Sequence, residues 1–553
     1  MMRWVDHLIV APIVLPLLAG ALLVLVDEHR RRLKFAISLV AVLGLLAVAV
    51  ALVAFANGQP DGWRSEVGVY LAANWPVPFG IALAADRLSA LMVLLSAMLG
   101  LASLVFAQAR WVRAGVHFQA LLQFLLMGLC GAFLTADLFN LFVFFEVLLA
   151  ASYGLVLHGS GPVRVGAGLH YVAVNLVASS LFLVGVSMIY ATSGTLNMAD
   201  LARLLPGLAP EDRLLFESGA AVLAVAFLVK SAMWPLAFWL LPAYSAASTP
   251  AAAIFAIMTK VGVYVILRLW LLLFVDGSGP SAGFGRDWLL YGGMATIGFA
   301  AIGMLATQDL RRLASYSVVM SSGTLLAAIA FDRPAVLAGA LYYLVSATFA
   351  ASALYLLIEL VERSRAFGSG VLAVTLEAFE AQGALHAGPA IATDEQDDTG
   401  IVIPAAMAFL GTSFVACALL TAGLPPLSGF VAKFALLAGV LDPAGSRAPD
   451  DVGVVAWTMV GLVVASGLVA AIATMRIGIR VFWVQVRRAP PRLRVIEAAP
   501  VAALLLACVA ITIQAGPVMR YVESAVTAAH RAGAWVDAVI EAPPVPVPGE
   551  ARR

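Results

Sequence analysis

The chain consists largely of long apolar runs that short polar segments separate. A helix needs roughly 20 apolar residues to cross a bilayer, and about 14 runs qualify. Lipid offers the backbone no hydrogen-bond partners, so only helices or closed barrels span it, and runs this long are not typical of barrel strands. The pattern predicts an all-α polytopic membrane protein with spans at residues 8–26, 35–56, 84–107, 115–134, 138–157, 166–190, 217–240, 249–275, 288–306, 313–330, 335–358, 402–438, 453–484 and 498–517.

Composition supports lipid as the solvent. Hydrophobic residues make up 62% of the chain and charged residues 12%, whereas a soluble domain is roughly 45–50% apolar and about 25% charged. The net charge of +1 gives no electrostatic support for nucleic-acid binding. We find no phosphate-binding loop, Ser/His/Asp set or metal-ligand spacing, so we expect no cofactor, no metal and no enzymatic activity of the chain's own. The three cysteines are interpreted as small core residues (Cys130, Cys417, Cys508).

Arginine and lysine distribution predicts the orientation. The first apolar run precedes its basic cluster (Arg30, Arg31, Arg32, Lys34), which is the wrong charge order for a cleaved signal peptide. Loops on the side of residues 27–34 carry fifteen basic residues, against seven on the other side when the C-terminal tail is left out. The positive-inside rule then places this arginine-rich side in the cytoplasm and both termini outside.

Three segments are expected to lie outside the bilayer. Residues 196–206 are interpreted as a short interfacial helix. Residues 362–400 form the largest predicted cytoplasmic loop, whose acidic cluster either docks a partner or, as we favour, is simply solvated (Asp394, Glu395, Asp397, Asp398). Residues 518–553 combine an amphipathic segment with a Pro-rich end, which predicts a lateral or disordered tail.

One internal repeat is visible, since residues 233–239 resemble residues 424–430. Two proline-containing spans would not be rare by chance, but here the flanking residues are shared as well. The copies lie five predicted helices apart, and an odd number inverts the topology. We expect helix breaks at Pro235, Pro425, Pro426 and Gly429, because proline frees backbone groups in mid-membrane. Paired broken helices are a good sequence indicator of a transport site.

Lysine is rare in this chain and occurs mainly within the apolar spans. Of the 33 basic residues only four are lysine, and Lys230, Lys260 and Lys433 lie within apolar spans. Arginine cannot lose its proton in a protein, whereas a buried lysine can. The pattern is typical of proton carriers. The alternative, lysines that snorkel to an interface, is less favoured because all three lie in mid-span.

Two further polar features accompany these lysines. Glu146 is an isolated carboxylate that needs a partner or a proton. Lys230 is the candidate partner, and a protonated structural glutamate is the alternative. Lys260, Tyr264 and Arg268 follow at i, i+4 and i+8, forming either a path toward the outside or a polar seam. Asp86 begins a span and is expected to cap it.

These motifs together resemble a known family. Residues 227–242, with their Lys-Ser-Ala-Met-Trp-Pro core, look like the seventh-helix signature of the antiporter-like subunits shared by respiratory complex I and the Mrp-type multisubunit monovalent cation/proton antiporters. Residues 259–264 and 424–433 resemble the D-type Mrp subunit in particular, and residues 316–317 and 341–344 also fit. Complex I subunits of the nearest type tend to have Glu where Lys433 stands, and the larger relatives carry long C-terminal extensions.

The resemblance implies a fold and an activity. The fold has two inverted five-helix repeats, helices 4–8 and 9–13, which divide the chain into 1–112, 113–276, 277–490 and 491–553. Protons would pass along the membrane midplane through Glu146, Lys230, Lys260 and Lys433. The implied activity is exchange of sodium, potassium or lithium for protons in the bacterial inner (plasma) membrane, for pH and cation homeostasis. The implied partners are membrane lipid and the other subunits of a hetero-oligomeric complex of roughly six or seven different subunits.

One departure stands out. The family often places histidine on helices ten and eleven, where this chain has neither His nor Lys. A relay from Lys260 to Lys433 would then need water and hydroxyl groups. The possible auxiliary residues are Tyr264, Arg268, Tyr316, Ser321, Tyr343, Ser346 and Thr348. Two rival functions stay open: a proton-pumping subunit of a complex I-like redox complex, and a non-transporting scaffold subunit.

Overall fold

The computed structural model describes residues 7–58, 63, 66–275, 279–383, 405–441, 453–483 and 493–544, although not the side chains of 364–383. Eleven helical segments of this part of the chain are long and apolar enough to cross a membrane. They are α2 (Arg31–Ala56), α3 (Arg87–Ala109), α5 (Leu138–Leu157), α6 (Pro162–Ser193), α10 with α11 (Thr249–Phe255 and Met258–Leu273), α12 (Arg286–Ala306), α13 (Leu310–Phe331), α14 (Pro334–Gly383), α15 (Ala405–Ala422), α17 (Val454–Gly478) and α18 (Val495–Ile513).

Shorter elements fill the other predicted spans. α1 (Ala11–Leu25) and α4 (Phe118–Leu134) occupy the first and fourth windows. The seventh window holds α8 (Pro210–Lys230) followed by α9 (Leu240–Ala246), and α16 (Ser428–Leu441) continues α15 in the twelfth. Every predicted window therefore contains helix, and the predicted polytopic all-α fold with broken helices seven and twelve is confirmed.

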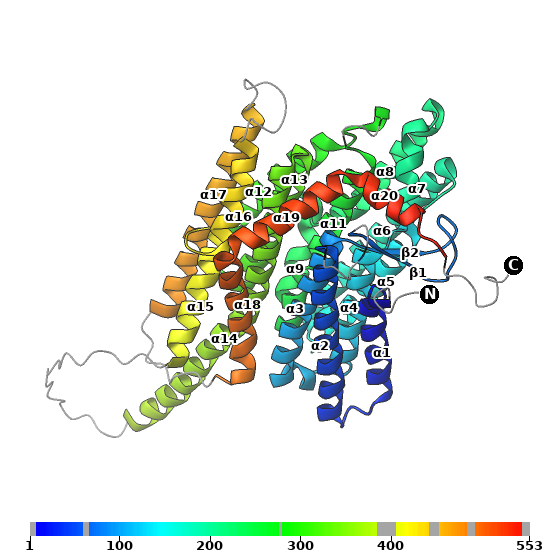
Figure 1. The fold of residues 1–553 in the computed structure, drawn as a ribbon. Coiled ribbons are helices and arrows are strands. Elements are labelled where there is room, and N and C mark those ends of the chain that lie inside the picture. Colours follow the sequence, from blue (N-terminus) through cyan, green and yellow to red (C-terminus); the bar gives the residue numbers. More distant parts are fainter. Residues whose placement is uncertain are drawn as a thin grey trace.

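The helices form one bundle in which the two halves of the chain lie beside each other (Figure 1). Successive spans alternate in direction. The set from α4 to α11 therefore begins on the arginine-rich side, and the set from α12 to α17 begins on the opposite side. The two broken helices cross the membrane in opposite senses as a result. The span of α10 with α11 and the spans of α13 and α14 are the most enclosed, since all residues of the apolar window are buried in the first and 94% in each of the others.

Several elements lie outside the spans. α7 (Met198–Leu204) is a short helix within residues 196–206, as predicted. α19 (Ala515–His530) and α20 (Ala532–Ile540) run across the bundle on the side opposite the arginine-rich loops, so the predicted amphipathic segment is a lateral helix (Figure 1). The antiparallel hairpin of β1 (Gly68–Leu71) and β2 (Ala82–Ala85) was not expected from the sequence. Residues 545–553, at the Pro-rich end, lie outside the described residues.

One boundary prediction is wrong. α14 does not end near residue 358 but continues to Gly383, into the loop predicted over 362–400. Local propensity contributes to this extension: residues 364–383 contain no proline, and eight of the 20 are Ala, Leu or Glu, which favour helix, against three glycines. The acidic cluster at 394–398 lies outside the described residues.

Candidate functional site

The first helix break lies directly after Lys230. α8 ends at this residue, and the chain is not helical again until a 3₁₀ turn over Leu236–Trp239. Pro235 has no N–H to continue a helix. Turn residues beyond the break donate to the last carbonyls of α8, Met233 N–H to Leu228 at 3.1 Å and Ala232 N–H to Val229 at 3.0 Å. The indole Nε1 of Trp239 donates to one of them, the Val229 carbonyl, at 3.0 Å.

The second break separates α15 from α16. Gly423 adopts a left-handed φ of 76°, and Pro425 and Pro426 follow before α16 begins. The half-helices approach so closely that a Cβ on Gly429 would lie 2.2 Å from the Leu420 carbonyl oxygen. Glycine is therefore required at position 429. Both predicted breaks are present, the first beside Pro235 and the second at Pro425 and Pro426.

Lys433 is hydrogen-bonded to the end of the half-helix that precedes its own. Its Nζ donates to the Ala422 carbonyl at 2.9 Å and to the Thr421 carbonyl at 3.3 Å. The side chain is 7% exposed. A cation at a helix C-terminus is favourable because the carbonyl end carries partial negative charge. Lys433 thus both caps α15 and has its charge compensated.

Lys230 is in a different situation. Its Nζ is buried and has no hydrogen-bond partner among the described residues, and the side chain is 5% exposed. The ammonium lies 5.3 Å from the centroid of the Phe145 ring, within range of a cation–π interaction. An aromatic face compensates an ammonium less than a carboxylate does. Among the three buried lysines, Lys230 is therefore the one whose ammonium makes no hydrogen bond to the described residues.

Glu146 lies on α5 and directly follows Phe145. The carboxylate is half-buried, and its Oε1 has no hydrogen-bond partner in the described part of the chain. No ion pair within 4.0 Å joins Glu146 to Lys230. The pairing expected from the sequence is thus not formed in this conformation, although Phe145 brings the two residues into one neighbourhood.

Lys260 connects the two halves of the chain. It lies in the first turn of α11 and is 1% exposed. Its Nζ donates to Ser321 Oγ of α13 at 2.5 Å and to Thr259 Oγ1 at 3.2 Å. Ser321, one of the predicted auxiliary residues, therefore contacts a predicted carrier directly, across 61 positions of sequence.

Of the other residues with predicted hydroxyl roles, some lie on helices between Lys260 and Lys433 and one does not. Ser346 of α14 is hydrogen-bonded to Ser428, the first residue of α16, at 2.8 Å. Thr348 donates to the Leu344 carbonyl one turn back, and Tyr343 is buried. The ring of Tyr316 packs instead against Phe299 of α12, with centroids 6.0 Å apart. Ser321 and the Ser346–Ser428 pair thus lie on helices between Lys260 and Lys433, whereas Tyr316 belongs to a helix contact.

Tyr264 and Arg268 form a fully paired seam. Arg268 donates to both carboxylate oxygens of Asp86, at 2.6 and 2.8 Å, and to the Tyr264 hydroxyl at 3.1 Å. The Tyr264 hydroxyl donates to the Phe133 carbonyl at 2.7 Å. Trp535 of the lateral helix covers the Arg268 guanidinium, with the ring centroid 5.4 Å away. Of the two open interpretations of the stripe, the geometry favours the seam.

Asp86 has a second role that the sequence did not reveal. It caps α3, as expected, by accepting a hydrogen bond from the Ser89 backbone N–H. Its pairing with Arg268 spans 182 positions, and no local pattern could have indicated it.

A hydroxyl cluster between Glu146 and the arginine-rich side was also missed. Tyr153 lies seven residues, two helical turns, from Glu146 on α5, and its buried hydroxyl has no partner among the described residues. Its ring packs on Tyr171 of α6, with centroids 5.5 Å apart. The Tyr171 hydroxyl is hydrogen-bonded to Ser152 at 2.7 Å. The only available signal was the spacing of seven on one apolar helix.

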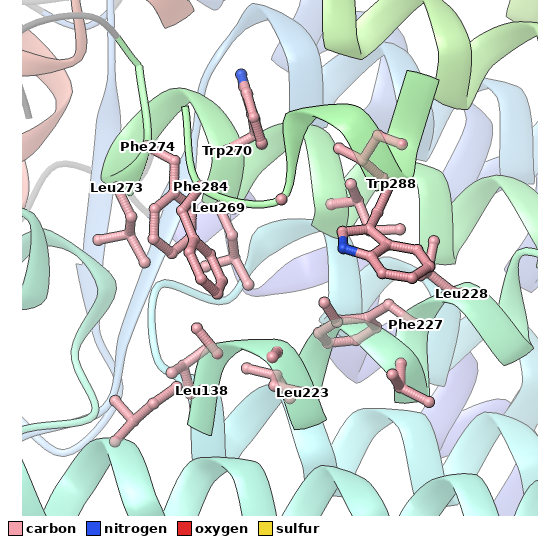
Figure 2. A pocket seen from close by; sticks show the side chains of 18 residues that line it. Leu138, Leu223, Phe227, Leu228, Leu269, Trp270, Leu273, Phe274, Phe284 and Trp288 are labelled. Atoms are coloured by element: carbon pink, nitrogen blue, oxygen red, sulfur yellow. The ribbon is translucent and has the colours of Figure 1, made fainter. Parts of the chain in front are cut away.

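An apolar cavity of about 480 Å³ flanks the last turns of α8 (Figure 2). Phe227 and Leu228, just before Lys230, line one wall, and Trp270 and Trp288 line others. Such a lining does not hold ions, so the cavity is not a cation site. Within the described residues, no three His, Cys, Asp or Glu side chains come together as a metal-ligand group.

Comparison with known sequences and structures agrees with this geometry. A family model described as "NADH:quinone oxidoreductase/Mrp antiporter, TM" matches residues 135–446, which include both broken helices. The probable D-type subunit of a K(+)/H(+) antiporter from Rhizobium meliloti (strain 1021) is 54% identical over 524 residues, covering 95% of this chain and 96% of that protein. The D-type subunit of a Na(+)/H(+) antiporter from Alkalihalophilus pseudofirmus is 33% identical, covering 86% and 87%.

Solved structures give the same fold. The Mrp complex from Dietzia sp. DQ12-45-1b contains a chain that matches with a TM-score of 0.79 at 24% identity, covering 98% of this chain and all of that one. Respiratory complex I from Thermus thermophilus contains another, with a TM-score of 0.70 at 22% identity, covering 95% and 99%. The chain therefore belongs to the NADH:quinone oxidoreductase/Mrp antiporter transmembrane family, and within it to the branch of the D-type antiporter subunits.

Proposed function

We propose that this chain is the proton-translocating subunit of a multisubunit monovalent cation/proton antiporter, and that Glu146, Lys230, Lys260 and Lys433 form its relay. The observation that carries the proposal is the Lys230 ammonium, buried without a hydrogen-bond partner among the described residues at the end of a broken helix. A scaffold has no use for a buried ammonium that lacks a hydrogen bond in that position. The names of the relatives, which are K(+)/H(+) and Na(+)/H(+) antiporter subunits, point to the same activity.

The relay begins at the first break. Burial without a counter-ion disfavours the charged form of an ammonium, whereas a nearby carboxylate favours it. When Glu146 closes on Lys230, the lysine holds its proton. When the pair opens, as in this conformation, Lys230 gives the proton up toward Lys260. The two groups titrate as a unit because each one sets the charge of the other.

The second stage passes through hydroxyls. Lys260 is already hydrogen-bonded to Ser321 of α13. From there the Ser346–Ser428 pair leads to the start of α16, which carries Lys433. Water would bridge the remaining distances. This arrangement supplies the path that the absence of histidine and lysine from helices ten and eleven otherwise leaves open.

The wider setting follows from the family. We place the chain in a bacterial inner membrane, with the arginine-rich side toward the cytoplasm and both termini outside. It would work with roughly six or seven different subunits, and sodium, potassium or lithium would exchange for protons. The proton gradient and the membrane potential supply the driving force.

The test measures exchange in everted vesicles that hold the whole complex. A pH gradient is preset, and its collapse on adding sodium or potassium is followed for wild type, Lys230→Ala and Lys34→Ala. Lys34→Ala is a matched control because it removes the same charge outside the relay, where Lys34 pairs with Glu28. We expect Lys230→Ala to abolish exchange while the complex still assembles. Full exchange by an assembled Lys230→Ala complex would reduce the chain to a scaffold.

A further inference from the structure

A cavity on the arginine-rich side is lined by guanidinium groups. It lies between the start of α2 and the 3₁₀ turn Trp111–Arg113, and its volume is about 590 Å³. Four arginines take part, three from one segment and one from the other. No carboxylate contributes to the lining, which consists of His29, Arg30, Arg31, Arg32, Leu33, Gln108, Val112 and Arg113.

The carboxylates nearest in sequence are engaged elsewhere. Asp27 Oδ1 accepts a hydrogen bond from the backbone N–H of His29, at 2.9 Å, and pairs with its ring at 2.8 Å. Glu28 pairs with Lys34 at 2.7 Å and with His117 at 3.1 Å. Burial raises the pKa of Glu28, but Lys34 and His117 outweigh burial and hold that pKa below its ordinary value. Glu28 therefore stays charged and committed to those two residues.

The cavity arginines are consequently left without an ion-pair partner in the described part of the chain (Arg30, Arg31, Arg32, Arg113). Two other arginines of the same side are paired: Arg311 with Glu362, and Arg363 with Glu497. A guanidinium presents a planar fork of donors that fits phosphate oxygens. Several such forks around one cavity indicate a multiply charged or phosphate-bearing anion.

An apolar surface continues directly from this cavity along α2. Leu33, which lines the cavity, is 44% exposed, and Val40, Leu43 and Val50 follow it at 70%, 46% and 54%. The intervals of seven, three and seven keep these residues on one helix face. Only 28% of the residues in the apolar part of this span are buried within the chain, so this face is not covered by the described residues. A soluble anion would use the cavity alone, whereas a phospholipid would use both surfaces.

We propose that this cavity binds the phosphate headgroup of an anionic phospholipid, whose acyl chains lie along the α2 face formed by Leu33, Val40, Leu43 and Val50. Basic pockets at the cytoplasmic ends of membrane helices are suited to such headgroups. The bound lipid would fix α1 and α2, the outermost helices of the first half, to one leaflet.

The test uses the whole purified complex, stripped of lipid in detergent and titrated with dioleoyl-phosphatidylglycerol or dioleoyl-phosphatidylcholine. Bound lipid is counted by native mass spectrometry. We expect phosphatidylglycerol to be retained in preference to phosphatidylcholine. The triple variant Arg31→Gln/Arg32→Gln/Arg113→Gln should weaken phosphatidylglycerol binding by roughly fivefold for each arginine removed. Arg312→Gln is the control, because Arg312 is exposed on the same side but away from the cavity.

Two further measurements distinguish a bound phospholipid from a free anion. Inorganic phosphate at millimolar concentration should not displace the lipid, and Val40→Ser/Leu43→Ser should weaken lipid binding while the arginines remain. If the triple variant does not assemble, Arg113→Gln alone is compared with Arg312→Gln. Equal phosphatidylglycerol binding by variant and control overturns the proposal. So does displacement by phosphate, which would indicate a free-anion site, or loss of a partner protein with lipid retained, which would indicate an acidic protein surface.

Discussion

The two broken helices use the same motif but compensate their lysines differently. In the first, Lys230 is the last residue of the leading half-helix, and Trp239 beyond the break donates to the carbonyl of Val229. In the second, Lys433 lies on the trailing half-helix and reaches back to the carbonyls of Thr421 and Ala422. The indole in one break and the ammonium in the other thus both donate to carbonyls at the end of the leading half-helix, at positions one to two residues apart in the alignment.

The internal repeat explains this exchange of roles. Trp239 aligns with Phe430, whose ring has no polar hydrogen to donate. At the second break the donor must come from elsewhere, and Lys433 supplies it. At the first break the donors are Trp239 and the backbone of the turn, and Lys230 makes no hydrogen bond to the described residues. Of the two, we therefore expect the first break to be the switch and the second to be the more rigid site.

Breaking the ion pair between Arg268 and Asp86 should cause the largest loss of stability among the variants considered. Asp86→Ala leaves this guanidinium buried without its carboxylate, and removing one partner of a buried pair costs about 3–5 kcal/mol. Thermal unfolding of the purified complex measures the loss. The double variant Asp86→Ala/Arg268→Met should recover much of it. A double variant no more stable than Asp86→Ala alone would show that the pair's charge balance is not what matters.

The close approach of the two half-helices at the second break should give the next largest loss of stability when it is disturbed. Gly429→Ala places a Cβ 2.2 Å from the Leu420 carbonyl oxygen, and overpacking of this kind costs typically about 1–3 kcal/mol. The aligned residue of the first break, Phe238, is 51% exposed and tolerates change. Thermal unfolding should therefore separate Gly429→Ala from Phe238→Ala. Equal stability of the two variants would mean that the half-helices can separate freely.

Removing the donor at the second break should have a comparable cost. Lys433→Met leaves the Thr421 and Ala422 carbonyls without their donor, and hydrogen bonds that involve a charged group contribute about 1.5–3 kcal/mol. Lys433→Gln keeps a donor and should lose a smaller part of the stability. If Lys433→Met unfolds at the wild-type temperature, the ammonium does not cap α15.

Removing the donor at the first break should cost less stability. Trp239→Phe removes the hydrogen bond to the Val229 carbonyl and keeps the ring, so the loss should be about 1 kcal/mol. Trp288→Phe is the control, because Trp288 is 78% exposed. Unfolding temperatures that do not differ between these two variants would contradict the capping role of Trp239.

Lys230→Met should have the smallest effect on stability and the largest on transport. The change removes a buried charge that has no partner among the described residues, and such a charge is unfavourable. The unfolding temperature should stay at or above that of wild type while exchange is lost. A marked loss of stability would mean that Lys230, like Lys433, holds its helix break together.

The sequence by itself determined the positions of the spans, the two breaks and the three buried lysines. The physical reason is that lipid penalises every exposed polar group, so a charge or a proline within an apolar run can be recognised without knowing its neighbours. The same reasoning could not place the end of α14, because residues 364–383 leave the apolar run and local helix propensity decides there.

Only the tertiary structure decided which groups meet. The pairing of Arg268 with Asp86, the contact of Lys260 with Ser321 and the separation of Glu146 from Lys230 all depend on how distant helices pack. Hydropathy assigns a residue to a depth in the membrane but not to a neighbour across it. Helix packing fixes that neighbour, and in this protein it leaves the Lys230 ammonium without a hydrogen bond to the described residues while it provides Lys433 with two carbonyls.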